Sequence, residues 1–242
     1  MINIEKEKNR LIAWIRQTVG DAKVVIGISG GKDSSVAASA CVAALGKDRV
    51  IGVMMPDGVQ HDIDKAKMLI DFLKIPHYLI NLKTITDAFK ESISSNVGPN
   101  LTYQMRSNLA SRCRMTTLYN VAAMLGNCRV VNTGNASEAY VGYCTKYGDA
   151  SGDFSPLGGL LLHEVKALGY ALGLPRELIE KAPEDGLSGK TDEENFGFTY
   201  AELDHYIETG EIASPEKKKK IDHMHAISRH KFTPVPMFLP EK

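Results

Sequence analysis

The residues most able to do chemistry form one short string, Gly-Ile-Ser-Gly-Gly-Lys-Asp-Ser-Ser at positions 27–35. It joins a β-branched run to a helical pattern, so its backbone N–H groups would meet at a helix N-terminus, where anions bind. Adjacent glycines let that backbone approach a phosphate closely. A carboxylate at Asp33 beside phosphates requires a cation that neutralises both. The string therefore predicts a phosphate site with a divalent cation.

Other interpretations of this string were weighed. A lone Gly-Gly turn is usually a strand-to-helix connection that a residue such as Asp33 caps. A Walker A loop has the pattern G-x-x-x-x-G-K-S/T. Counted from Gly27, the second glycine of that pattern would fall at position 32, where this chain has Lys, so the string is not a Walker A loop. It also lacks the G-x-G start of a dinucleotide fingerprint. The full S-G-G-K-D-S string after a strand is more specific than either.

The rest of the chain alternates strands with helices up to position 134. Apolar, β-branched runs predict strands at 23–29, 49–55, 77–82 and 129–132, and helical spacing predicts helices at 33–45, 62–73, 84–94 and most of 103–125. This order predicts an α/β fold with a doubly wound parallel sheet flanked by helices. Further helices are expected at 161–172, 176–181, 200–208 and 215–228. A long loop is expected at 140–156, and an acidic, glycine-interrupted lid at 183–196.

Composition bounds the class of protein. The 242 residues carry 29 basic and 29 acidic side chains, and 43% are hydrophobic, which excludes disorder and argues against nucleic-acid binding. The sequence shows no span for a membrane and no secretory signal, so a cytoplasmic protein is expected. Cys41, Cys113, Cys128 and Cys144 fit neither zinc nor disulfide spacing and are expected to be buried thiols. One domain spanning residues 1–242 is expected.

Further strings give the chain a family resemblance. The loop at 27–35 looks like the pyrophosphate-binding loop of the ATP pyrophosphatase superfamily, which has the adenine nucleotide alpha-hydrolase-like fold. Within it, Asn-Leu-Ala-Ser-Arg-Cys-Arg-Met at 108–115, Thr-Gly-Asn-Ala-Ser-Glu at 133–138 and Gly-Tyr-Cys-Thr-Lys-Tyr-Gly-Asp at 142–149 resemble motifs of NAD synthetases. Met-Pro-Asp-Gly-Val-Gln at 55–60 and His230-Lys231 are also similar. The chain has no room for an upstream glutaminase domain, so the ammonia-dependent form is implied.

The resemblance implies a reaction and a set of site residues. The reaction is ATP-dependent amidation of deamido-NAD with ammonia through an NAD-adenylate, giving NAD, AMP and pyrophosphate, with Mg²⁺, in a homodimer. Asp33 and Glu138 would be catalytic and would hold the metal. ATP would be held by Gly27, Ile28, Ser29, Gly30, Gly31, Lys32, Asp33, Ser34 and Thr133. Deamido-NAD would be held by Arg112, Lys146, Asp153, His230 and Lys231, while Arg114 would do the same or pair with an acidic neighbour.

The chain departs from the family pattern at two places. Many members have an ATP-contacting Lys where this chain has Leu162, and Ser or Thr in the stretch where it has Glu184-Asp185-Gly186-Leu187. These departures leave two alternatives open: a non-catalytic or divergent nucleotide-binding paralogue, and another ATP pyrophosphatase. Each charged candidate could alternatively be a solvated loop or helix-end residue.

Overall fold

The computed structural model describes residues 3–60, 63–180 and 191–241. Its centre is a four-stranded, fully parallel sheet in the order β3-β2-β1-β4. The strands are β1 (Lys23–Gly27), β2 (Val50–Met54), β3 (His77–Leu79) and β4 (Cys128–Val130). The chain moves outward from β1 to β3 and then returns to the other side of β1, so the strand order reverses between β1 and β4. This confirms the predicted doubly wound α/β fold, and such a reversal is where open sheets bind ligands.

Eleven α-helices and two 3₁₀ helices occur in the described part of the chain. They are α1 (Ile4–Val19), α2 (Lys32–Leu45), η1 (Lys47–Arg49), α3 (Ile63–Leu73), α4 (Lys83–Asn96), α5 (Tyr103–Leu125), α6 (Ala136–Val141), α7 (Leu162–Ala171), α8 (Arg176–Ile179), α9 (Asp192–Phe196), α10 (Tyr200–Thr209), α11 (Pro215–Ser228) and η2 (Arg229–Lys231). None of the helices described is both long and apolar enough to cross a membrane.

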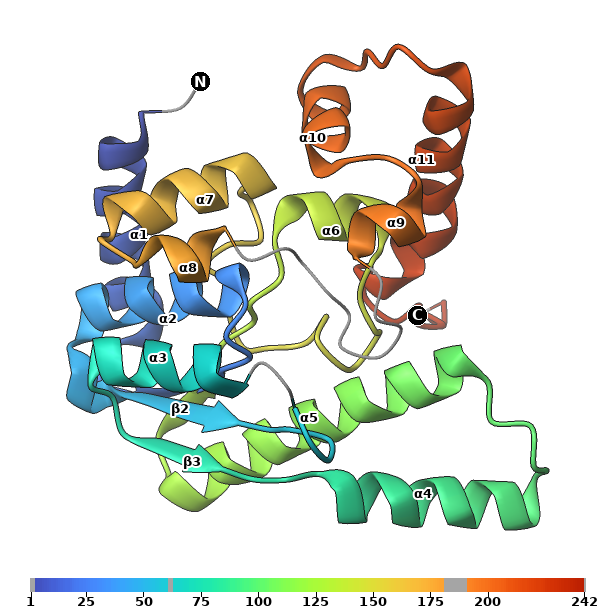
Figure 1. Cartoon of the computed structure of the whole chain (residues 1–242), viewed down its shortest axis with the longest axis horizontal. Coiled ribbons are helices and arrows are strands. Elements are labelled where there is room, and N and C mark those ends of the chain that lie inside the picture. The colour runs from blue at the N-terminus through green and yellow to red at the C-terminus, as the bar shows by residue number, and fades with distance from the viewer. Residues whose placement is uncertain (1–2, 61–62, 181–190, 242) are drawn as a thin grey trace.

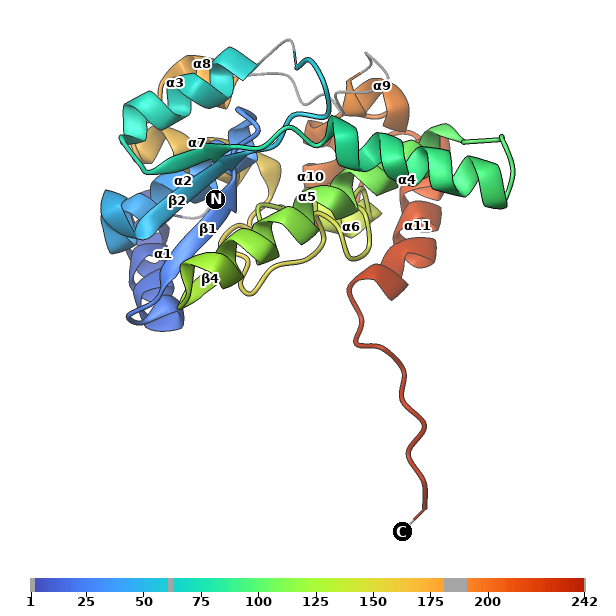
Figure 2. The same cartoon turned by 90° about the horizontal axis from the view of Figure 1, so that it is seen from below.

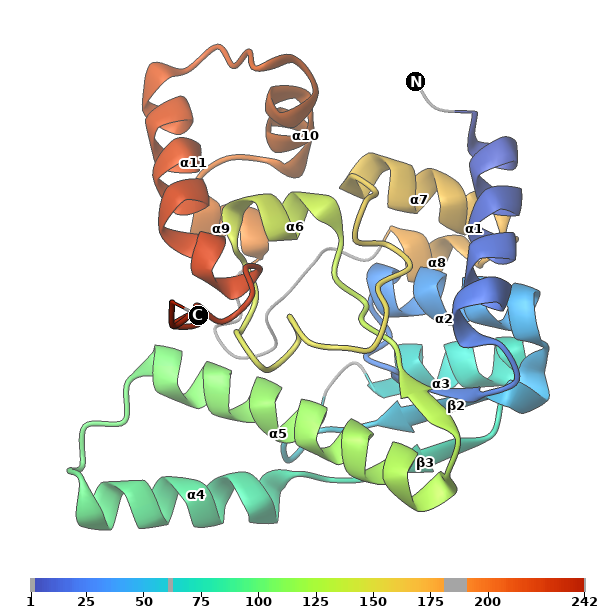
Figure 3. The same cartoon turned by 180° about the vertical axis from the view of Figure 1, so that it is seen from behind.

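Alternate side chains of the sheet face two separate hydrophobic clusters. Val24 and Ile26 of β1 pack with residues of α1, α2, α3, α7 and α8 on one face. Val25, which points the other way, packs with Val130 and with Leu118 of α5. Figures 1 and 3 show α5 crossing that second face, with α4 beside it. Burial of both faces explains why the central strands β1 and β2 are nearly continuous apolar runs.

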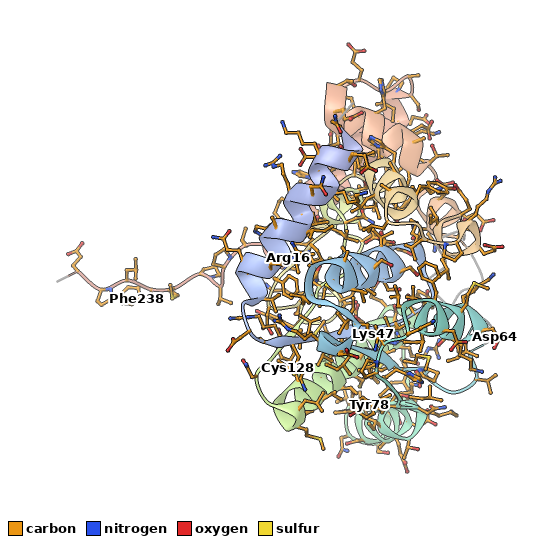
Figure 4. The ribbon with its side chains drawn as sticks, turned by 90° about the vertical axis from the view of Figure 1, so that its left-hand side faces the viewer. Arg16, Lys47, Asp64, Tyr78, Cys128 and Phe238 are labelled. Carbon is orange, nitrogen blue, oxygen red and sulfur yellow. The ribbon has the colours of Figure 1, made fainter. Side chains whose placement is uncertain are left out.

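Two helices, α1 and α6, were not predicted from the sequence, in addition to the short α9 within the predicted lid. The first, α1, begins at the cap residue Asn3, and Ile15 and Val19 of its apolar face are buried. Arg16, labelled in Figure 4, donates from Nε to the Ala44 carbonyl at the end of α2, 2.8 Å away. The second, α6, begins with a capping box made by Asn135 and Glu138. Asn-x-x-Glu before an apolar residue is a helix-start signal that the sequence carries openly.

The C-terminal helices form a third cluster beside the sheet. Its members come from α6, α7, α9, α10 and α11 and include Phe196, Tyr200, Leu203 and Ile221. Beyond η2 the chain leaves the body as an extended segment that ends near Phe238 (Figures 2 and 4). Helix α9 falls within the stretch 183–196 that was expected to be a lid, and residues 183–190 of that stretch lie outside the described residues.

Candidate nucleotide site

The loop between β1 and α2 is held by hydrogen bonds among its own residues. Ser29 and Ser34 hydroxyls lie 2.9 Å apart, and Gly31 N–H donates to Ser29 Oγ at 3.1 Å. The Gly31 carbonyl accepts from Ser34 Oγ at 3.1 Å and from Ser35 Oγ at 2.7 Å. These bonds fix the loop without a ligand, so the backbone donors at the start of α2 are already oriented.

Gly30 is required by its surroundings as well as by its backbone. Its φ is +77°, and a Cβ there would fall 2.5 Å from the backbone nitrogen of Ala66 and 2.8 Å from Lys65 of α3. No side chain fits into that space, because the nearest atoms are backbone. The loop is therefore pressed against the first turns of α3.

Asn135 connects the two candidate catalytic carboxylates. Its side-chain nitrogen donates to Asp33 Oδ1 at 2.9 Å, and its side-chain oxygen accepts from the Glu138 backbone N–H at 2.9 Å. Asn135 is fully buried. The amide therefore joins the start of α2 to the start of α6, which follows β4, and brings Asp33 and Glu138 to the same end of the sheet.

The electrostatics of this pair favour a divalent cation. Burial and the negative charge of Asp33 hold the pKa of Glu138 well above its usual range. Two carboxylates that oppose each other's ionisation are the oxygen ligands that Mg²⁺ prefers, with substrate phosphates and water completing its shell. The described residues hold no cluster of three or more side chains that could bind a metal ion, and these two carboxylates are the candidate protein ligands.

A third carboxylate and a buried lysine lie next to the pair. Lys32 Nζ is 3.3 Å from Asp33 Oδ2 and 5.7 Å from the centre of the Tyr200 ring. The Tyr200 hydroxyl donates to Asp192 Oδ2 at 3.0 Å. Burial and the charges of Glu138 and Asp192 raise the pKa of Tyr200, so it stays a neutral donor. Helices α9 and α10 thus contact the phosphate loop through one aromatic ring.

A cavity of about 480 Å³ opens at the reversal point of the sheet. Gly27 at the end of β1, Thr133 and Glu138 after β4, and Lys231 of η2 all line it. Four predicted residues from distant parts of the sequence therefore share one cavity. Its remaining walls come mainly from α5 and from residues 142–149.

The loop at 142–149 is tied to α5 and to the C-terminal end. Ser111 Oγ donates to Asp149 Oδ1 at 2.6 Å, and Thr145 Oγ1 donates to Asn108 Oδ1 at 3.0 Å. Lys231 Nζ donates to the carbonyls of Gly142 and Cys144, each at 2.7 Å. The hydroxyl of Ser111 therefore anchors the loop.

The other predicted deamido-NAD residues lie near the cavity without lining it. Arg112 is exposed and donates from Nε to the Lys146 carbonyl at 3.2 Å, and Lys146 Nζ donates to the His230 carbonyl at 2.7 Å. The His230 side chain is exposed. Asp153 accepts from Val130 N–H at 2.7 Å and from the Tyr119 hydroxyl at 3.1 Å, so one of its oxygens supports the end of β4 and the other contacts α5. Arg112, Lys146 and His230 thus form one chain of contacts.

The structure describes one of the two places where the chain departs from the family pattern. Leu162 is the first residue of α7, and its side chain is buried in the third cluster with Val141 and Phe196. Its backbone N–H donates to Ser137 Oγ at 2.9 Å. An apolar residue therefore fits its surroundings at this position. Glu184 lies outside the described residues.

Arg114 contributes more to the cavity than the sequence predicted. Its guanidinium lines the cavity, donates from Nε to the Met55 carbonyl at 3.2 Å, and has its pKa lowered by burial while Asp57 and Asp149 oppose that shift. It remains a cation at neutral pH. Arg112 and Arg114 are two positions apart on α5, so they face different directions, and the helical period could have separated their roles. Asp192 also lines the cavity and was missed because it lay within the predicted lid.

Comparison with known proteins agrees with this geometry. The family model described as NAD synthase matches residues 7–235. A curated relative from Archaeoglobus fulgidus, named NH(3)-dependent NAD(+) synthetase, is 41% identical over 240 residues, which is 95% of each chain. Among solved structures, NMN synthetase from Francisella tularensis is 35% identical with a TM-score of 0.88 and covers 98% of this chain and 100% of its own.

A second solved structure is the NH3-dependent NAD synthetase from Campylobacter jejuni, 28% identical with a TM-score of 0.81, covering 99% of this chain and 100% of its own. The family match and the archaeal relative each extend over nearly the whole chain. The two solved structures share the overall fold of this chain. The chain belongs to the NAD synthase family.

Proposed function

We propose that this protein is a C–N bond-forming ligase that amidates deamido-NAD with ammonia at the expense of ATP. The observation that carries the proposal is the cavity that brings Gly27, Thr133, Glu138 and Lys231 together at the carboxyl ends of β1 and β4. The first residue of the phosphate loop, one candidate metal ligand and a cation for a second anionic substrate thereby meet in one place, and Asn135 links Asp33 to it. Family membership supports the same activity.

The reaction takes place in two steps. A nicotinate carboxylate oxygen of deamido-NAD attacks the α-phosphorus of ATP, and the bond to the β-phosphate oxygen breaks, which releases pyrophosphate. Ammonia then attacks the carbonyl carbon of the adenylate, AMP leaves with its electron pair, and the added nitrogen loses a proton to give the amide. Adenylation is needed because a carboxylate is a poor acyl donor.

Different residues of this chain bind the phosphates, deamido-NAD and the metal ion. The loop at 27–34 holds the β- and γ-phosphates with backbone N–H groups and the Ser29 and Ser34 hydroxyls. Thr133 contacts ATP from the end of β4. Arg112, Lys146, Asp153, His230 and Lys231 hold deamido-NAD, and Arg114 faces the same cavity. Asp33 and Glu138 would hold Mg²⁺, which when bound neutralises charge that develops on the phosphates.

The partners and surroundings follow from the same proposal. The protein acts as a homodimer in the cytoplasm, on substrates that are free in solution, and it binds neither nucleic acid nor membrane. Its balanced charge of 29 acidic and 29 basic residues supports the absence of a nucleic-acid partner. Residues 1–242 act as a single domain that uses free ammonia.

The test is an NAD-formation assay with purified protein, ATP, Mg²⁺, ammonium chloride and deamido-NAD. We expect one pyrophosphate and one AMP per NAD, and no product when any one component is left out. ATP consumption without NAD, or no reaction with the complete mixture, would contradict the proposal.

A second candidate product deserves the same assay. The Francisella tularensis protein with a TM-score of 0.88 is named an NMN synthetase, so the corresponding amidation that yields NMN is an alternative use of this cavity. Competition between deamido-NAD and nicotinate mononucleotide at equal concentration separates the two. A higher kcat/KM for the mononucleotide would assign the NMN-forming activity.

A further inference from the structure

Lys32 is a buried lysine inside the phosphate loop. Its side chain is only 2% exposed, although it occupies the first position of α2. Burying an ammonium group is costly unless charges or hydrogen-bond acceptors compensate for lost water. Its contacts in the described part of the chain are Asp33 Oδ2, at 3.3 Å, and the face of the Tyr200 ring, at 5.7 Å.

The surroundings of Lys32 are strongly negative. Asp33 is its direct partner, at 3.3 Å, and Asn135 joins Asp33 to the backbone of Glu138. The Tyr200 ring that Lys32 faces carries a hydroxyl that donates to Asp192. One ammonium thus has one carboxylate in direct contact and two more linked to its neighbours. A triphosphate would add several more negative charges at this point, so a fixed positive charge is electrostatically valuable.

The Tyr200 ring keeps the ammonium in this position. The ring belongs to α10, and its own placement is fixed by the hydroxyl bond to Asp192 and by the Tyr200 backbone N–H, which donates to Glu193 Oε1 at 2.9 Å. Phe196 packs edge-on against it at 5.6 Å between ring centres. A cation over a rigid, partly desolvated aromatic face is stabilised there. The arrangement holds the ammonium beside the carboxylates and leaves the loop backbone free to bind phosphate.

We propose that Lys32 is a positioning residue whose ammonium is a built-in counter-cation for Asp33 and Glu138, so that the site accepts ATP with less dependence on added metal. The proposal rests on the proposed function in one respect, that these two carboxylates hold Mg²⁺. The proposed role of Lys32 has two effects of opposite sign on ligand binding. The ammonium weakens binding of free Mg²⁺ by repulsion and strengthens binding of ATP by attraction.

The experiment is titration calorimetry on the full chain at fixed pH and ionic strength, with MgCl₂ alone and, separately, with ATP in the presence of a chelator. Lys32→Met removes the charge and keeps the length of the side chain. Lys32→Arg keeps the charge, and Lys47→Met removes an exposed lysine from the turn beyond the far end of α2 (Figure 4). Thermal denaturation confirms that each variant is folded, and Lys32→Gln replaces Lys32→Met if the latter is not.

We expect Lys32→Met to bind Mg²⁺ roughly tenfold more tightly and ATP roughly tenfold more weakly, while Lys32→Arg stays within about threefold of wild type. Lys47→Met should match wild type in both titrations. Weaker ATP binding with unchanged Mg²⁺ binding would overturn the proposal in favour of a direct phosphate ligand. No change in either would reduce Lys32 to a packing residue. Failure of the wild type to make NAD or NMN would overturn the proposed function alone, since the calorimetry does not depend on turnover.

Discussion

The two sides of the cavity are built in different ways. On the phosphate side, the hydrogen bonds of Ser29, Ser34 and Ser35 join residues two to five positions apart. On the opposite side, Lys146 contacts the His230 carbonyl across 84 positions, and Lys231 contacts the Gly142 carbonyl across 89. The conformation of the phosphate loop is therefore set by local sequence, whereas the opposite wall exists only after the C-terminal helices have packed.

Substitutions in the two walls should therefore have different effects. A substitution in the phosphate loop disturbs donors and carboxylates that touch ATP, whereas the fold of the sheet behind them is held by separate clusters. A substitution in the far wall disturbs the docking of η2 on the loop at 142–149, so it should change substrate affinity before it changes chemistry. Variants in each wall test whether the two walls have these separate roles.

The largest effect is expected from the carboxylates on the phosphate side. Asp33→Asn and Glu138→Gln should each lower kcat by at least about 100-fold, because each removes charge that stabilises the transition state through the metal. Pyrophosphate release at saturating Mg²⁺ measures this. Glu180→Gln, which changes an exposed carboxylate bonded to Tyr170, is the matched control and should remain active. Near wild-type rates in either site variant would remove that residue from the mechanism.

Alanine at three glycines compares the two walls directly. Gly30→Ala should abolish ATP binding, because its Cβ would lie 2.5 Å from the backbone of Ala66 in α3. Gly142→Ala should raise KM for the dinucleotide substrate and lower the unfolding free energy by about 1–3 kcal/mol, because its Cβ would meet Ser228 of α11. Gly20→Ala tests backbone strain alone, since φ is +61° and no atom lies within 4 Å.

Denaturant unfolding and separate titrations of ATP and deamido-NAD are the measurements for these variants. Gly20→Ala should be destabilised by about 1 kcal/mol with unchanged KM values. If Gly142→Ala affects only ATP binding, or Gly30→Ala only the dinucleotide, the two walls do not have the separate roles assigned to them.

The sequence predicted the phosphate wall well for a physical reason. The β-branched run, the paired glycines and the helical spacing after them are all local signals, and they place β1, the loop and α2 within a few residues. A helix was predicted over most of residues 103–125, and the observed α5 fills that whole range, from its cap residue Thr102 to Gly126. The parallel order followed from the alternation of strands and helices.

The far wall was harder to predict because its contacts are distant in sequence. Arg112, Lys146, Asp153, His230 and Lys231 were named by resemblance; of these, Lys231 lines the cavity, together with Arg114, for which two roles had been left open. Helix α1 was missed although Asn3 and the spacing of Ile15 and Val19 signal it. On the phosphate side, too, a distant contact escaped prediction: Asn135 was not singled out, because its contact with Asp33 spans 102 positions.

A smaller effect is expected from Lys231. Lys231→Met removes two hydrogen bonds, to the carbonyls of Gly142 and Cys144, and one positive charge from the cavity. We expect KM for deamido-NAD to rise roughly tenfold, as one charge-assisted contact is worth about 1.5–3 kcal/mol, with KM for ATP within about twofold of wild type. Lys231→Arg should recover part of the loss. An equal rise in both KM values would contradict a separate deamido-NAD wall.

The smallest effect compares one thiol from each region. Burial raises the pKa of Cys41, inside α2, to about 12. Burial and the negative charge of Asp149 raise the pKa of Cys144, in the far wall, to about 12 as well, from an ordinary 9.0. Of these two thiols, only Cys144 is partly exposed, and it lines the cavity.

At pH 9, where an ordinary thiol is half ionised, about one Cys144 in a thousand would be thiolate, and this fraction rises about tenfold for each unit up to pH 12. Iodoacetamide should therefore alkylate Cys144 slowly, with a rate that still climbs steeply above pH 9, whereas Cys41 should stay unmodified in the folded protein because it is inaccessible. Peptide mass spectrometry separates the two sites, and protein unfolded in urea supplies the reference rates. Deamido-NAD should slow the reaction at Cys144 because the ligand fills the cavity, while ATP alone should protect it less. Equal protection by both ligands, or a Cys144 rate that levels off near pH 9, would mean that this wall is more open to solvent than the structure shows.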